Sequence, residues 1–111
     1  MIDQKNLRWI KVAESTAEIT QRGERTMMEV RVGGKEICII YHQEKLFACT
    51  ANCPHAGGKL INGSVDAAGN IACPLHRYRF QLKNGFNCSG EGYHLKTYPV
   101  NETEEGVFIG I

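Results

Sequence analysis

Two short motifs in the middle of the chain each combine a cysteine with a histidine, and they constrain the fold more than any other feature. The first is Cys53-Pro54-His55 and the second is Cys73-Pro74-Leu75-His76. A proline fixes its own φ and has no N–H, so each motif is a stiff turn. Such a turn can hold two side chains toward one metal centre, so we expect the fold to bring two separate loops together.

The four side chains that these motifs supply form a ligand set with two sensible uses. One is a tetrahedral structural zinc ion. The other is a [2Fe–2S] cluster in which two histidines replace two cysteines on one iron. Finger-type zinc sites usually pair cysteine with cysteine and histidine with histidine, whereas each motif here supplies one of each. The mixed order favours the cluster, and zinc stays open as the alternative.

Length and charge indicate an ordinary globular domain. The chain has 111 residues, of which 42% are hydrophobic, and this is enough for a buried core. Thirteen basic residues stand against twelve acidic ones, for a formal net charge of +1. This balance argues against a protein that binds nucleic acid or a membrane surface. We expect a single domain over residues 1–111.

The cellular compartment is predicted from what the sequence lacks. No segment approaches the roughly 18 apolar residues of a membrane span, and the N-terminal residues contain no apolar stretch of the length that a secretion signal needs. The five cysteines are an odd number, which argues against a secreted disulfide scaffold. We therefore expect a cytoplasmic protein whose cysteines serve metal binding or chemistry.

Many short strand-like segments with turn signals between them predict an all-β fold. Gly33-Gly34 and residues 42–45 are expected to be turns, and Ala13–Ile19 is the one segment expected to form a helical turn. Thr50–Asn70 is expected to be a long irregular loop, and such loops are usually functional. The expected strands are Leu7–Val12, Met28–Val32, Glu36–Tyr41, Leu46–Cys49, Arg79–Leu82, Lys96–Val100 and Val107–Ile111.

The segment from about Lys45 to Val100 resembles the Rieske family. The resemblance is carried by ANCPHAGGKLINGSV, IACPLHRYRFQLKNG and LKTYPV, and the chain is similar to Rieske ferredoxins and to the small subunit of assimilatory nitrite reductases. It implies an all-β Rieske fold, an antiparallel sandwich or barrel base with a cluster-binding subdomain inserted at about 47–92. It also implies one [2Fe–2S] cluster per chain, with the inner iron bound by Cys53 and Cys73 and the outer iron by His55 and His76.

The function implied by this resemblance is one-electron transfer by a soluble ferredoxin. The chain has no room for a second domain with a mononuclear iron, and it has no G-x-G-x-x-G motif for a dinucleotide. We therefore expect an electron carrier rather than an enzyme, which serves a reductase and a terminal oxygenase and has no small-molecule substrate of its own. The alternatives are a small subunit of a nitrite reductase-like enzyme and a zinc-stabilised structural domain.

Three departures from the family pattern bear on the expected site. Rieske proteins of bc-type complexes have a disulfide between the two cluster loops, and here Gly58 and Leu75 stand at those positions. Those proteins also place a serine and a tyrosine where this chain has Tyr78 and Phe80, so fewer hydrogen-bond donors predict a potential in the lower part of the Rieske range. Many members have glycine where Arg77 stands, and its cation would either raise the potential or shape a partner surface.

The other candidate residues have simpler interpretations. Cys38 and Cys49 are expected to be buried, as free cysteines often are, and Cys88 is expected to be exposed without a role. Trp9 is expected to anchor the core. His42 and His94 are expected to be surface or packing residues rather than ligands. Lys59 and Arg79 are expected to be solvated charges, with part of a docking surface as the alternative.

Overall fold

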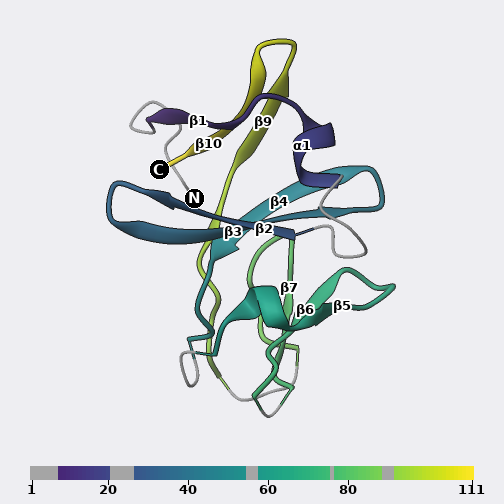
Figure 1. The fold of residues 1–111 in the computed structure, drawn as a ribbon. Helices are drawn as coiled ribbons and strands as arrows, with labels where there is room; N and C mark the ends of the chain where they lie inside the picture. Colours follow the sequence, from purple (N-terminus) through teal and green to yellow (C-terminus); the bar gives the residue numbers. More distant parts are fainter. Residues whose placement is uncertain (1–7, 21–26, 55–57, 76, 89–91) are drawn as a thin grey trace.

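Three small antiparallel sheets, one above another in the view of Figure 1, make up most of the described chain. The structure is a computed structural model and describes residues 8–20, 27–54, 58–75, 77–88 and 92–111. The strands are β1 (Trp9–Ala13), β2 (Met27–Val32), β3 (Lys35–His42), β4 (Lys45–Thr50), β5 (Ser64–Val65), β6 (Asn70–Ala72), β7 (Arg79–Gln81), β8 (Thr97–Tyr98), β9 (Val100–Thr103) and β10 (Gly106–Gly110). The upper sheet has the order β1–β10–β9, the central sheet β2–β3–β4–β8, and the lower sheet β5–β6–β7. The predicted all-β fold is confirmed.

The register of the central sheet is set by two tight turns. Gly33 and Gly34, at φ 57° and 82°, join β2 to β3, and Gln43 and Glu44, at φ 50° and 66°, join β3 to β4. Positive φ at both central residues is typical of two-residue hairpin turns whose twist matches that of the strands. Strands β2 and β4 therefore each pair along their whole length with β3.

Strand β3 is buried on both of its faces, which explains its nearly continuous apolar sequence. Ile37 and Ile39 belong to the core between the central and upper sheets. Cys38 and Ile40 belong to the core that the central sheet shares with the lower sheet. Successive side chains of a strand point to opposite faces, so one strand supplies both cores. The predicted burial of Cys38 is confirmed, as is that of Cys49, which lies directly opposite on β4.

Two predicted segments differ from the structure in ways that have a physical cause. The expected irregular segment Thr50–Asn70 contains a 3-10 helix, η2 (Leu60–Asn62), and the two-residue strand β5. The expected strand Lys96–Val100 is divided at Pro99 into β8, which pairs with β4, and β9, which pairs with β10. A proline lacks the N–H that a continuous ladder needs, and here the chain passes from the central to the upper sheet.

The first strand and the short helix beside it also depart from the expectation. Trp9 is 41% exposed, so its predicted role as a core anchor is wrong. It lies on β1, an edge strand that pairs only with β10 among the described strands. The helix α1 (Thr16–Thr20) begins later than the expected helical turn and buries Ile19. No helix in the described ranges has the length and apolar character needed to cross a lipid bilayer.

The lower core gives a prediction about stability. Phe80 of β7 is 0% exposed and packs in the core below the central sheet, whereas Phe86 is 55% exposed. Replacing Phe80 with alanine should lower the free energy of unfolding by about 3–5 kcal/mol, because a cavity remains. The same change at Phe86 should alter it by no more than about 0.5 kcal/mol. Urea unfolding followed by circular dichroism measures both, and equal losses would contradict this description of the core.

Candidate metal centre

The two cysteine motifs lie in two loops of equal length that are closed by the same hydrogen bond. In the first loop (residues 53–58) the N–H of Cys53 donates to the carbonyl of Gly58 at 2.8 Å. In the second loop (residues 73–78) the N–H of Cys73 donates to the carbonyl of Tyr78 at 2.8 Å. The residues just outside each loop form antiparallel pairs: Asn52 with Lys59, and Ala72 with Arg79. Each cysteine therefore begins a turn whose two ends are fixed.

The thiols of the two loops lie next to each other in the lower core. Cys53 is 3% exposed and Cys73 is 1% exposed. Burial raises the pKa of the Cys73 thiol, the backbone N–H of Leu75 lowers it, and the neighbouring Cys53 thiol raises it. The structure thus brings together two of the four predicted ligands. The other two, His55 and His76, lie outside the described residues.

The two loops approach so closely because the first one has a glycine at the contact. A Cβ atom at Gly58 would lie 3.1 Å from Sγ of Cys73 and 3.1 Å from Cδ1 of Leu75. Positions 58 and 75 therefore face each other across the loops, as the comparison with the disulfide-containing family members predicts. In this chain a glycine against a leucine side chain takes the place of a covalent link.

The residues present fit a [2Fe–2S] cluster with mixed ligands. Two buried sulfur atoms converge from two loops, and each loop has a histidine in its sequence within three residues of the cysteine. The N–H of Leu75 already donates to Sγ of Cys73, and hydrogen bonds to cluster sulfurs help to set the potential. Phe80 is fully buried in the same core as both cysteines and has no hydroxyl to donate. The low potential expected from this residue stays a prediction.

A lysine that follows the first loop ties it to the central sheet. Nζ of Lys59 lies 2.8 Å from Oε1 of Glu29 on β2 and 3.1 Å from Oε2 of Glu36 on β3. These contacts raise the pKa of Lys59, and hydrogen bonds from Lys59 and Arg31 lower the pKa of Glu36. The sequence predicts only a solvated or docking charge at Lys59, because no local spacing relates positions 29, 36 and 59.

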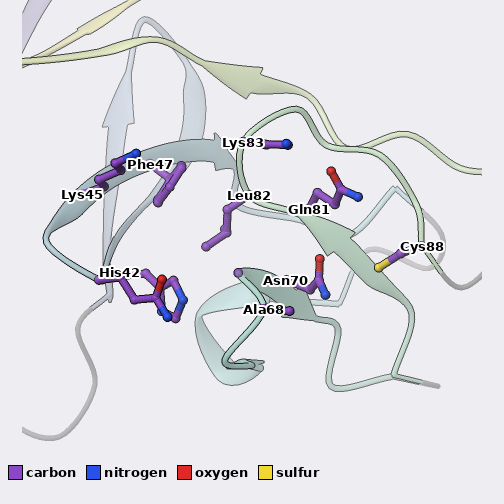
Figure 2. A pocket seen from close by; sticks show the side chains of 11 residues that line it. His42, Lys45, Phe47, Ala68, Asn70, Gln81, Leu82, Lys83 and Cys88 are labelled. Carbon is purple, nitrogen blue, oxygen red and sulfur yellow. The ribbon is translucent and has the colours of Figure 1, made fainter.

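A groove of about 390 Å³ lies beside the lower sheet rather than at the two loop cysteines, Cys53 and Cys73 (Figure 2). It lies between His42, at the end of β3, and Leu82 and Lys83, which follow β7. Gln43 also lines it, and its Nε2 donates to the carbonyl of Ala67 at 3.1 Å. Neither of the two loop cysteines lines this groove, so we interpret it as the seam between the central and lower sheets.

Comparison with known families gives a match over most of the chain. The family model described as Rieske [2Fe-2S] domain matches residues 8–99. The ferredoxin component of the naphthalene 1,2-dioxygenase system of Pseudomonas aeruginosa is 29% identical over 89 residues, which cover 79% of this chain and 85% of that protein. A ferredoxin component of the naphthalene 1,2-dioxygenase/salicylate 5-hydroxylase systems of Ralstonia sp. is 32% identical, and the match covers 69% of this chain and 74% of the relative.

The chain is also similar to part of a larger enzyme and to a ferredoxin of known structure. Cholesterol 7-desaturase nvd of Bombyx mori is 28% identical over 108 residues, and the match spans only 23% of that enzyme. The ferredoxin of carbazole 1,9a-dioxygenase from Nocardioides aromaticivorans IC177 superposes with a TM-score of 0.75 at 23% identity, over 89% of this chain and 95% of that one. This likeness confirms the predicted fold.

The ion pairs of Lys59 predict a pH-dependent contribution to stability. A lowered pKa of Glu36 stabilises the fold above its unfolded-state pKa, and this contribution is lost as the pH falls through the folded-state value. A raised pKa of Lys59 stabilises the fold below its unfolded-state pKa, and this contribution is lost as the pH rises through the folded-state value. Lys59→Met should therefore be less stable than the wild type between about pH 5 and pH 10, with a smaller difference outside that window.

Urea unfolding at a series of pH values measures this difference. Lys45→Met is the matched control, because Lys45 is exposed and forms no ion pair within the described part of the chain. A pH-independent difference for Lys59→Met would show that the lysine acts through packing alone.

The close contact of the loops predicts an effect of Gly58→Ala on iron retention. The new methyl group would press on Sγ of Cys73, so loss of iron to a chelator should become roughly tenfold faster. Gly34→Ala is the control, because Gly34 has φ 82° and a methyl group there would meet nothing within 4 Å. It should cost about 1 kcal/mol of stability through its left-handed backbone and leave iron retention unchanged. A wild-type rate of iron loss in Gly58→Ala would exclude tight packing at this contact.

Proposed function

This chain belongs to the Rieske [2Fe–2S] domain family, and on that premise we propose that Cys53, His55, Cys73 and His76 hold the one cluster with which it transfers single electrons. Cys53 and Cys73 supply thiolates to the inner iron, and His55 and His76 supply neutral imidazoles to the outer iron. The observation that carries this assignment is the convergence of the two buried cysteines from two loops closed by the same hydrogen bond.

The chain holds its ligands and limits the access of water to them. When bound, the cluster supplies a reversible one-electron couple. Burial of both cysteines in the lower core keeps their sulfur atoms away from solvent. The Leu75 N–H donates to Cys73 and so stabilises negative charge on that sulfur. The antiparallel pairs just outside each loop hold the two cysteines and the Leu75 N–H in place. These groups would therefore need little rearrangement during electron transfer.

The role we propose is that of an electron carrier between redox proteins, a reductase and a terminal oxygenase, without catalysis by the chain itself. Support comes from the relatives that are ferredoxin components of dioxygenase systems and are matched over 74–85% of their length. We further propose one Rieske domain over residues 1–111 with a cluster-binding subdomain at about 47–92. A reducing compartment, the cytoplasm, suits its five free cysteines.

Absorption and EPR spectra of protein purified without oxygen test this proposal. A red-brown sample should give, after dithionite, a signal with an average g below the free-electron value. Cys53→Ser and Cys73→Ser should each lose the signal together with most of the bound iron. Cys88→Ser, which changes an exposed cysteine, should keep both. A colourless sample with one zinc ion per chain would overturn the electron-transfer proposal and support a structural zinc site.

A further inference from the structure

An arginine in the second loop has a backbone conformation that does not suit its residue type. Arg77 has φ 55°, in the left-handed region that glycine adopts without strain. Its side chain is exposed, and no hydrogen bond or ion pair holds it among the described residues. The arginine thus occupies a position where the backbone favours glycine and where no hydrogen bond or ion pair within the described fold stabilises its side chain. Outside hairpin turns such as that of Gln43 and Glu44, residues with a strained backbone are enriched at functional sites.

A second arginine lies close by and shares a surface hollow with the first. Arg79 is the first residue of β7 and is exposed. The hollow, of about 470 Å³, is lined by Ser64, Asp66, Ala72, Arg77 and Arg79. The Asp66 carboxylate accepts hydrogen bonds from the backbone N–H groups of Ala68 and Asn70, both at 3.0 Å. These bonds and the charge of Arg79 lower its pKa, and one carboxylate committed to its own turn leaves the hollow with a net positive charge.

Charge is unevenly distributed along the chain. Residues 47–92 contain four basic and two acidic residues, while the rest of the chain contains nine basic and ten acidic ones. Within residues 47–92, Lys59 is already paired with two glutamates of the central sheet. The hairpin of β9 and β10 contributes three exposed glutamates, and Figure 1 shows it at the end of the molecule opposite the lower sheet. The two arginines thus belong to the basic segment, with Arg77 inside the second loop and Arg79 directly after it.

We propose that Arg77 and Arg79 form a basic docking surface for an acidic patch on the redox partner. A guanidinium group pairs with a carboxylate through two parallel hydrogen bonds, so Arg77 favours a carboxylate on the partner surface, and the positive charge of Arg79 beside it adds to the attraction. Leu75, which is 45% exposed in the same loop, supplies an apolar contact beside them. One electron passes from the reduced chain to the acceptor of the partner, and no bond or proton is exchanged. The inference rests on the proposed function, because it takes the second loop to be part of the redox centre.

Two small oxidants of opposite charge test the sign of the surface charge in the protein that carries its cluster. Each takes one electron from the reduced chain: hexacyanoferrate(III), an anion, becomes hexacyanoferrate(II), and hexaamminecobalt(III), a cation, becomes cobalt(II). Stopped-flow rates at low ionic strength should fall roughly tenfold for the anion in Arg77→Gln/Arg79→Gln and should not fall for the cation. Salt should remove the difference. The matched control is Lys35→Gln/Lys45→Gln, which removes two exposed cations of the central sheet and should leave both rates unchanged.

A binding measurement tests the partner chemistry without electron transfer. Fluorescein-labelled hexaglutamate should bind the oxidised wild type at low salt, as seen by fluorescence anisotropy, and should bind the arginine variant several-fold more weakly than the lysine control. Arg77→Gly, which suits the backbone at this position, serves as a second variant if the double variant does not fold.

The outcomes separate this inference from the proposed function. Equal losses in the arginine and lysine variants would overturn the docking surface while leaving electron transfer intact. A sample that exchanges no electron with either oxidant would overturn the proposed function. The hexaglutamate binding would then still test whether the arginines form a basic surface. Self-association of the wild type at low salt in sedimentation, absent in the arginine variant, would overturn the assignment to a partner and indicate a second copy of the chain.

Discussion

The pairing of two buried thiols across separate loops is the constraint on which the arrangement of this protein depends. Without a metal, burial and the neighbouring thiol both disfavour ionisation of Cys73. Under the proposed assignment, an iron bound to Cys73 would reverse this preference, because its positive charge favours the thiolate. The loops must therefore be held in place by the rest of the fold before coordination can stabilise them. Backbone hydrogen bonds at the ends of both loops do this, and so does the packing of Gly58 against Leu75.

The central sheet supports this centre because it is covered on both faces. Ile37 and Ile39 pack toward the upper sheet, while Cys38 and Ile40 pack toward the lower sheet that carries the second loop. A strand shared by two cores couples the outer layers mechanically, since neither can shift without disturbing β3. The ion pairs of Lys59 add a link at the surface between the first loop and this sheet. The loops are thus attached to a rigid layer rather than to each other alone.

Much of the fold and the sulfur half of the candidate site could be predicted from local sequence. The motifs that contain Cys53 and Cys73 indicate two converging loops, and the alternating pattern and turn residues of 27–50 indicate a hairpin pair. Strands of two or three residues, such as β5 and β6, are too short for periodicity to reveal. The prediction that Trp9 anchors the core is wrong because an apolar residue on an edge strand has the same local sequence pattern whether its side chain is buried or exposed to solvent. The contacts of Lys59 depend on tertiary structure alone.

The fold and the surface around the loops depend on different residues. At 23% identity the chain still superposes on the ferredoxin of carbazole 1,9a-dioxygenase with a TM-score of 0.75, so the architecture tolerates many different side chains. Arg77 illustrates the point, because its backbone would be less strained with glycine. A strained position without a stabilising contact is a poor place for a structural residue and a suitable one for a residue that meets another molecule. Because the closed loop fixes the backbone, the side chain at this position can vary without moving the cysteine that begins the loop, and the surface can be fitted to a partner while the redox centre stays in place.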